Sequence, residues 1–339
     1  MTPDPVDIVA LTRALVDIDS TTGREGEAGA WLASYLRGRG FAVVEQPVDS
    51  TRFNVMATLQ APPQLVFSTH FDCVPPFFPS RVDGDRVYGR GSCDAKGILA
   101  AQIAAAERLR ACGEPRFALL FLVGEERGSD GARVANAQAP QNVSYLINGE
   151  PTDNRLGTAT RGILRVRLRA TGRAAHSSFP ELGESAIDKL LDALMVVRGL
   201  PLPDDALLGR THYTVGLIEG GVAPNVVSPS ASAELMFRTV ADGAPIMAAL
   251  NVVDGLVHVE RVLEVEAVRM HVVDGFETAV FPYTTDVPLL TSWGMPLLIG
   301  PGSIHAAHTA DEHLAIDELR HAVDSYESLG QRLIAASVR

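Results

Sequence analysis

The sequence predicts an α/β protein in which a central sheet flanked by helices carries a smaller inserted domain. Apolar strand-like segments alternate with helix-like segments over residues 1–159 and again over residues 269–339. Between them, residues 160–268 follow the order strand, helix, two strands, helix and strand, which is typical of a compact βαββαβ insert. A chain of 339 residues is also longer than one hydrophobic core usually supports. We therefore expect a discontinuous first domain interrupted by the insert.

The pattern of apolar residues places the individual elements. In the first domain we expect helices at about 6–18, 27–39, 98–110 and 316–336, and strands at 41–44, 54–59, 65–69, 117–122, 143–147 and 296–299. In the insert we expect strands at 162–171, 213–220, 231–240 and 257–267, and helices at 185–200 and 244–256.

Composition excludes several classes of partner. A net charge of -12 argues against nucleic acid and against an anionic membrane surface. No stretch is apolar over enough residues to span a bilayer, and the N-terminus lacks the basic and then apolar segments of a signal peptide. The three cysteines have no metal-type spacing and suit a reducing compartment, and for Cys93 we expect a small buried thiol. These features predict a cytoplasmic protein.

Two adjacent carboxylates, Glu125 and Glu126, follow the apolar strand at 117–122. Adjacent carboxylates repel each other, so the pair favours a cation between or beside them. We interpret this cation as a pair of metal ions, with Glu126 as a ligand and Glu125 as the base that acts on a metal-bound water. A solvated turn is the alternative, because such pairs are common in polar loops.

Other candidate ligands also follow predicted strands. His70 and Asp72 come after the strand at 65–69, and Glu150 comes after the strand at 143–147. The spacing of His70 and Asp72 lets the carboxylate hold one imidazole nitrogen while the other faces a metal, although a hydrogen-bonded core histidine fits equally well. The carboxyl ends of strands are where ligands bind in open α/β sheets.

Two further candidates lie beside glycines. Asp94 lies in the glycine-rich stretch 89–97, and the glycines indicate close backbone approach around its carboxylate. Capping of the helix that follows is the alternative role for Asp94. His308 follows the strand at 296–299 and a Gly-Pro-Gly turn. His305 competes with it, and His308 is favoured because the tract 309–312 resembles the start of a helix.

The insert carries three polar residues of interest, His176, Asn225 and Arg238. Read from the residues alone, His176 and Arg238 fit surface positions on an exposed sheet as well as they fit a functional site.

Taken together, the motifs resemble the dinuclear zinc amidohydrolases, the family of acetylornithine deacetylase, succinyl-diaminopimelate desuccinylase, aminoacylase and glutamate carboxypeptidase. The motifs are His70-x-Asp72, Gly91-Ser-Cys-Asp94-Ala-Lys-Gly97, Gly124-Glu125-Glu126, Gly149-Glu150-Pro151-Thr152 and Gly300-Pro-Gly with Ala307-His308-Thr309. They occur in order over nearly the whole chain, so the resemblance is specific. It implies a catalytic domain with a mixed central sheet.

The resemblance implies two divalent metal ions, most of all zinc, with cobalt or manganese able to substitute. The implied ligands are imidazoles and carboxylates, with His70 and Glu150 on one ion, Glu126 and His308 on the other, and Asp94 bridging both. Asp72 would orient His70, and Glu125 would be the general base. A hydroxide that bridges the metals would then attack an amide carbonyl.

The resemblance also assigns the insert to dimerisation. His176 would reach into the partner's active site to stabilise an oxyanion, and Asn225 and Arg238 would contact the substrate. The motif wording is most similar to the acetylornithine deacetylase branch, which implies an N-acyl amino acid as substrate. His305 stands where that branch usually has another residue, which leaves the substrate open. The alternatives are a dipeptidase or carboxypeptidase of the same family and a catalytically silent metal-binding protein.

Overall fold

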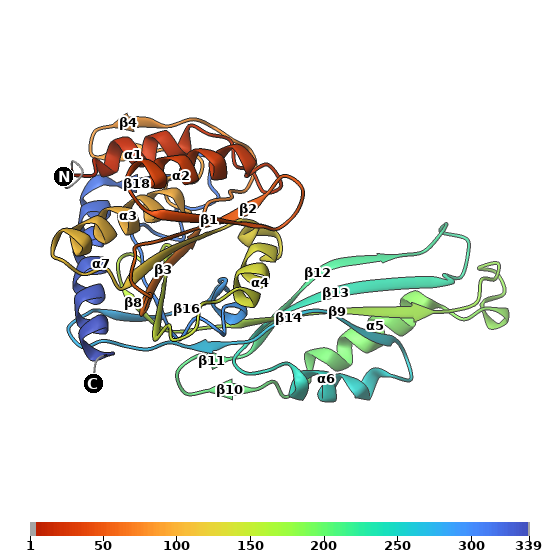
Figure 1. Cartoon of the computed structure of the whole chain (residues 1–339). Helices are drawn as coiled ribbons and strands as arrows, with labels where there is room; N and C mark the ends of the chain where they lie inside the picture. Colours follow the sequence, from red (N-terminus) through yellow and green to blue (C-terminus); the bar gives the residue numbers. More distant parts are fainter. Residues whose placement is uncertain (1–4, 338–339) are drawn as a thin grey trace. The chain divides into compact units, whose positions relative to one another are not determined.

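A computed structural model describes residues 5–337, and the chain divides into two compact units (Figure 1). The first unit consists of Met1–Thr158, Met270–Ala279 and Thr285–Arg339, and the second consists of Ala159–Arg269 and Val280–Thr284. Each unit buries its own hydrophobic core. No helix within the described residues is long and apolar enough to cross a membrane.

The first unit is built on a six-stranded sheet of order β1-β2-β6-β3-β7-β17. The bounds are Ala42–Pro47 for β1, Phe53–Thr58 for β2, Phe117–Leu122 for β6, Leu65–His70 for β3, Tyr145–Asn148 for β7 and Met295–Leu298 for β17. Strands β6, β3, β7 and β17 are parallel, whereas β1 and β2 are antiparallel to their neighbours. The sheet is therefore mixed, as predicted.

The central strands β3 and β6 are buried on both faces, which explains their unbroken apolar runs. Along β6, Phe117, Leu119 and Phe121 join the core formed with helices α1, α2, α3 and α7, and the residues between them join a smaller core with α4. The helix bounds are Ile8–Val16 for α1, Gly26–Gly38 for α2, Lys96–Ala111 for α3, Asp130–Ala137 for α4 and Ile316–Ala336 for α7.

Short elements shape the loops around the sheet. Strands β4 (Arg81–Asp83), β5 (Arg86–Tyr88) and β18 (His313–Ala315) pair in the order β18-β5-β4. Two 3-10 turns are η1 (Glu125–Arg127) and η4 (Val287–Leu289). The prediction that residues 309–312 start a helix is wrong. The tract leads into β18 instead, because the Glu312 side chain is buried and bonded to another loop rather than free to begin a helix.

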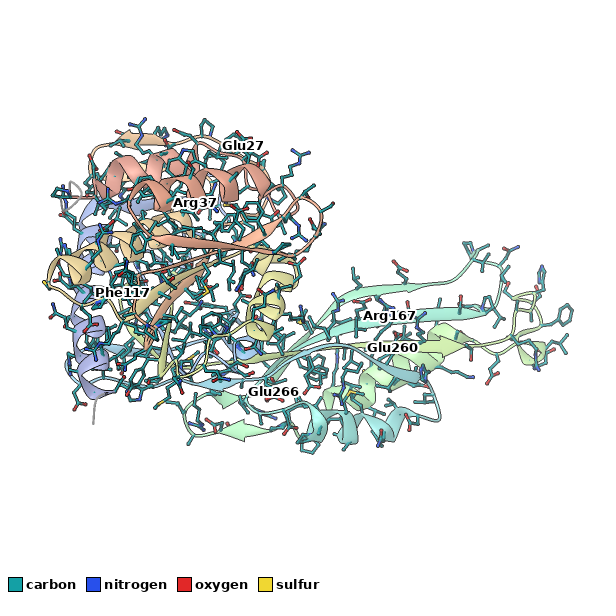
Figure 2. The ribbon with its side chains drawn as sticks, in the orientation of Figure 1. Glu27, Arg37, Phe117, Arg167, Glu260 and Glu266 are labelled. Atoms are coloured by element: carbon teal, nitrogen blue, oxygen red, sulfur yellow. The ribbon has the colours of Figure 1, made fainter. Side chains whose placement is uncertain are left out.

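The second unit is a four-stranded antiparallel sheet of order β12-β13-β9-β14. The bounds are Gly162–Thr171 for β9, His212–Gly220 for β12, Ser230–Thr239 for β13 and His258–Val265 for β14. One face packs against α5 (Ala186–Arg198) and α6 (Ala244–Leu250). The opposite face is polar: Arg167 pairs with Glu234 and lies 3.8 Å from Glu260 (Figure 2).

The remaining elements are short. They are η2 (Pro180–Leu182), β10 (Asp204–Asp205), β11 (Gly209–Arg210), η3 (Asn251–Val253), β8 (Leu156–Thr160), β15 (Val268–Arg269) and β16 (Thr278–Phe281). The order of strands and helices predicted for 160–268 is found, but the helix predicted at 244–256 ends at Leu250. Valines at 252 and 253 and a glycine at 255 disfavour its continuation.

Candidate metal centre

The predicted ligands that follow strands come together because β6, β3 and β7 are adjacent and parallel. His70 is the last residue of β3, Glu150 lies just beyond β7, and Glu126 lies in η1 just beyond β6. Their side chains thus leave one edge of the sheet, the edge where ligands bind in α/β proteins.

Asp94 lies between the two histidines. Its Oδ1 is 2.9 Å from Nε2 of His70, and its Oδ2 is 3.3 Å from Nε2 of His308. His308 also lies 2.9 Å from Oε1 of Glu126. Two groups result, within each of which the possible ligand atoms lie within 4.8 Å of one another. The first ligand group is His70, Asp94 and Glu150, and the second ligand group is Asp94, Glu126 and His308.

The structure does not support helix capping as the role of Asp94. The residue at the N-cap of α3 is Ala95, and no side chain caps this helix. The glycines nearby are required by close approach, as expected. A Cβ on Gly97 would clash with the backbone oxygen of Ser92, and Gly91 has a φ of +86°, which favours glycine.

Asp72 is the hydrogen-bond acceptor that organises the neighbouring residues. Its carboxylate accepts from the backbone N–H of Glu125 at 3.1 Å and of Glu126 at 3.2 Å, and from the Thr22 hydroxyl at 2.8 Å. Nδ1 of His70 lies 3.1 Å from the backbone oxygen of Asp72 and 3.4 Å from Oδ1. Asp72 therefore holds both the imidazole of His70 and the turn that carries the glutamates.

The electrostatics of the cluster indicate a shortage of positive charge. Burial raises the pKa of Glu125 and Glu150 well above their usual range, and neighbouring carboxylates raise both further. Burial also raises the pKa of Glu126. Hydrogen bonds to Asp94 and Glu126 raise the pKa of His308 to about 10. Burial and mutual repulsion thus favour the protonated carboxyl groups in this cluster, and a bound cation would oppose both effects.

The residues present fit two divalent metal ions. Imidazole nitrogens and carboxylate oxygens are ligands that zinc and related ions take. Oε1 of Glu150 is buried and has no hydrogen-bond partner within the described residues, as expected of an atom that bonds to an ion. The two carboxylate oxygens of Asp94 face different ligand groups, so this residue can serve both ions.

Sequence reasoning missed two buried carboxylates of this region. Asp286 is 1% exposed, and burial raises its pKa to about 6, although nearby Ser129 and the charge of His70 lower it. Glu312 is fully buried and bonds to the loop that carries Asp94. Asp286 follows two threonines, and no glycine or histidine motif marks it. Glu312 lies in the tract 309–312, where the sequence predicts the start of a helix.

The three predicted residues of the insert lie in the second unit, at two places. His176 and Asn225 are exposed on adjacent loops, where the backbone N–H of Ser177 donates to the backbone oxygen of Asn225 at 3.0 Å. Arg238 is half-buried on β13, eight residues from Ser230, the end of β13 nearest those loops. At a rise of about 3.4 Å per residue, that separation is roughly 27 Å.

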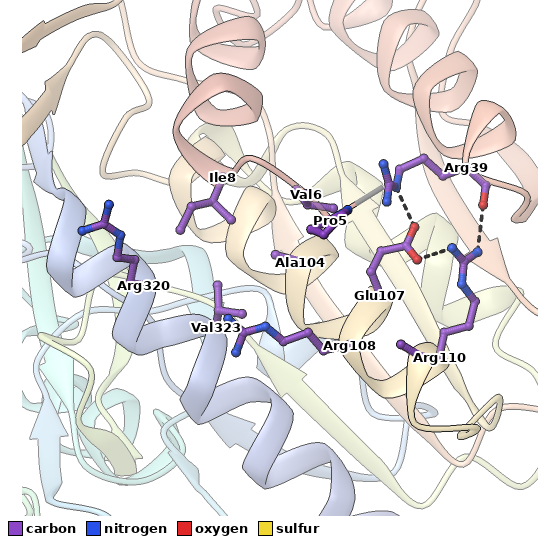
Figure 3. Close-up of a pocket in the computed structure, with 11 residues that line it drawn as sticks. Pro5, Val6, Ile8, Arg39, Ala104, Glu107, Arg108, Arg110, Arg320 and Val323 are labelled. Carbon is purple, nitrogen blue, oxygen red and sulfur yellow. Dashed lines mark hydrogen bonds and ion pairs between the residues drawn. The ribbon is translucent and has the colours of Figure 1, made fainter. Parts of the chain in front are cut away.

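An apolar pocket of about 420 Å³ lies elsewhere in the first unit, among α1, α3 and α7 (Figure 3). None of the ligand groups lines it. Four arginines surround it, and each is already paired: Arg39 and Arg110 with Glu107, Arg108 with Asp324 and Glu327, and Arg320 with Asp317. The pocket therefore offers no unpaired charge to a ligand among the described residues.

Residues 66–332 match Peptidase family M20/M25/M40. The chain belongs to this family. A probable carboxypeptidase from Aspergillus terreus is 38% identical over an alignment of 370 residues, which covers 94% of this chain and 84% of that protein. A Peptidase M20 domain-containing protein from Schizosaccharomyces pombe is 35% identical over 338 residues, covering 95% and 84%.

Solved structures share the fold at lower sequence identity. Aminopeptidase PepT from Bacillus cereus has a TM-score of 0.81 at 20% identity and covers 96% of this chain and 98% of its own. A dinuclear metal binding peptidase of the M20 family from Bacillus subtilis has a TM-score of 0.72 at 15% identity, with 97% of each chain covered. The family resemblance predicted from the motifs is thus confirmed, and the chain is a metal-dependent peptidase or amidohydrolase.

Proposed function

We propose that this enzyme hydrolyses the amide bond between an acyl group and the nitrogen of an amino acid whose carboxylate is free, with N-acyl amino acids as substrates. Arg238 carries this proposal. It is half-buried, it forms no ion pair or side-chain hydrogen bond within residues 5–337, and burial lowers its pKa. An unpaired guanidinium suits a carboxylate, which it can bind through two parallel hydrogen bonds.

In this proposal the first ligand group holds one ion, the second holds the other, and Asp94 belongs to both. Zinc is the ion that we expect, and cobalt or manganese suit the same donors. When bound, the ions would polarise the substrate carbonyl and acidify a water molecule.

Glu125 is the general base of the proposed reaction. Its backbone N–H is fixed by Asp72, so its carboxylate leaves a turn of defined geometry. It accepts the proton of the attacking water and delivers it to the leaving nitrogen. Bound cations favour the deprotonated carboxylate that this role requires, opposing the burial that raises its pKa.

We also infer that the enzyme acts as a homodimer formed through the second unit. Strand β12 is an edge of its sheet in the described chain, and it exposes Leu217 at 58% and Ile218 at 56%. Such an apolar edge is a natural pairing site for a second copy. The separation of roughly 27 Å between Arg238 and the His176 end of β13 supports this inference, since one small substrate cannot contact both places of one chain. His176 of a partner would then stabilise the oxyanion, with Asn225 beside it.

A carboxypeptidase or dipeptidase is the second candidate. The relatives from Aspergillus terreus and Aspergillus clavatus, at 38% and 37% identity, are named probable carboxypeptidases. A peptide presents the same terminal carboxylate to Arg238 as an N-acyl amino acid does.

A cytoplasmic location stays a prediction.

Amine release from a panel of N-acyl amino acids, dipeptides and longer peptides tests the proposal, with Zn²⁺, Co²⁺ or Mn²⁺ added. Turnover of acylated amino acids would support the deacylase, and turnover of peptides alone would support the second candidate. Arg238→Met should raise KM about 10- to 100-fold for carboxylate substrates and leave KM for the matching C-terminal amides unchanged. Equal turnover of acids and amides by the unaltered enzyme would contradict the role of Arg238.

A further inference from the structure

One buried carboxylate joins the loop that carries Asp94 to the loop that carries His308. Oε1 of Glu312 accepts from the backbone N–H groups of Gly91 at 3.0 Å, Cys93 at 3.2 Å and Asp94 at 3.1 Å. Its backbone oxygen accepts from Gly89 at 3.1 Å. Glu312 is fully buried, so these bonds are shielded from water.

Arg90 completes the contact. Its guanidinium donates to Oε2 of Glu312 at 2.5 Å and to the Pro76 oxygen at 3.2 Å, and it lies 5.0 Å from the centre of the Phe78 ring. Arg90 is 3% exposed. Removing either charged partner would leave the other buried and unpaired, and removing Glu312 would also strip three buried N–H groups of their acceptor.

The contact lies where it can control ligand geometry. The Asp94 N–H is one of the three donors, so the backbone of the shared ligand is held directly. His308 lies four residues before Glu312 in the same loop, and the ladder that pairs Tyr88 with His313 anchors both loops at their ends. Two of the three members of the second ligand group therefore depend on this contact, against one of three in the first.

We propose that Glu312, held by Arg90, is a positioning residue that sets the geometry between Asp94 and His308 and thereby the metal affinity of the second ligand group. The proposal rests on the metal centre proposed above. Within residues 5–337, the Glu312 carboxylate forms no hydrogen bond or ion pair with a ligand side chain, and it acts through the backbone of the Asp94 loop.

Glu312→Gln tests the proposal, because the amide keeps the size of the side chain but presents no second carboxylate oxygen to Arg90. We expect one of two Co²⁺ equivalents to bind about 10- to 100-fold more weakly, as for other residues that orient ligands, and the other to change less. Competition with a chromogenic chelator measures both affinities. The visible absorption that arises from the more weakly bound Co²⁺ should also differ between Glu312→Gln and the unaltered protein.

Glu107→Gln is the matched control. Glu107 is also a buried glutamate of the first unit, 9% exposed, and it pairs with two arginines, Arg39 and Arg110 (Figure 3). This variant should lose stability to urea yet keep both Co²⁺ affinities and the Co²⁺ spectrum. If Glu312→Gln loses stability to a similar extent while both affinities stay within about twofold of the unaltered protein, the proposal is overturned.

Arg90→Lys keeps the test decisive if Glu312→Gln does not fold. Lysine keeps the positive charge but replaces a planar fork with a single ammonium group, so it should fold and weaken one Co²⁺ equivalent by a smaller factor. Unchanged affinities in a folded Arg90→Lys protein would also overturn the proposal. Unaltered protein that binds fewer than two Co²⁺ ions would overturn the proposed metal centre itself, a failure distinct from that of Glu312.

Discussion

The first unit gathers its candidate ligands at the carboxyl ends of strands and in two neighbouring loops, and all of them except Glu126 and His308 are buried. The second unit carries two of its three candidate residues on exposed loops. In the first unit, Asp94 hydrogen-bonds to both histidines, and Asp72 fixes the Glu125–Glu126 turn. In the second unit, His176 and Asn225 are open to solvent, and Arg238 lies at the far end of β13. The candidate ligands of the first unit thus lie within 4.8 Å of one another in two groups, whereas in the second unit Arg238 lies roughly 27 Å from the loops of His176 and Asn225.

The largest change in activity should come from a substitution in the first unit, at Glu125. Glu125→Gln removes the proposed base, and we expect kcat to fall about 10³-fold while both metals stay bound, because Glu125 belongs to neither ligand group. Steady-state kinetics and elemental analysis measure the two quantities. Glu27→Gln, at an exposed glutamate of α2, is the control. Loss of metal together with activity would make Glu125 a ligand rather than the base.

The second prediction tests whether His176, on an exposed loop of the second unit, acts in the active site of a partner chain. His176→Ala should lower kcat about 10²-fold, as expected for loss of an oxyanion donor. Co-expression of His176→Ala and Glu125→Gln chains should then restore about a quarter of the activity, since half the dimers are mixed and one of their two sites is complete. Activity is assayed on the purified mixture. No recovery would place His176 in the site of its own chain.

A third and smaller effect concerns the metal-free centre. The pKa of Asp286 in the folded protein is about 6, above its ordinary value of 3.8, so its protonated form stabilises the fold. That stability is fully present below about pH 4 and is lost as pH rises through 6, at most about 3 kcal/mol of unfolding free energy. Asp286→Asn should therefore lose less unfolding free energy than the unaltered protein as pH rises through 6.

Urea unfolding of EDTA-treated protein at pH 4.5 and 7.5 measures the effect as the difference between the unaltered protein and Asp286→Asn. Other buried carboxylates, such as Glu125 and Glu150, add a loss of the same sign to both proteins. Asp83→Asn, at an exposed carboxylate of β4, should behave like the unaltered protein. An equal fall in stability in Asp286→Asn would show that Asp286 is not protonated in the folded state.

The sequence was sufficient to predict most of the fold, because the physical signals are local. Central strands such as β6 are buried on both faces and read as unbroken apolar runs, and α7 was placed at its observed bounds. The five predicted ligands are brought together by the structure, since strand ends and glycine turns mark them.

What the sequence did not reveal depends on pairs far apart in the chain. Glu312 bonds to backbone groups more than 200 residues away, and nothing in the tract 309–312 distinguishes it from a helix start. Asp94 precedes a helix and so fitted a cap, until its contacts with His70 and His308 were seen. Asp286 is marked by burial alone, which no spacing encodes.

The most direct test of the metal centre is metal stoichiometry, measured by equilibrium dialysis against Zn²⁺ followed by elemental analysis. We expect two equivalents in the unaltered protein, one in His308→Ala and one in His70→Ala, because each histidine belongs to one ligand group. Asp94→Asn should weaken both, since Asp94 belongs to the two groups. Fewer than two equivalents in the unaltered protein, or two tightly bound in His308→Ala, would contradict a dinuclear centre built from these residues.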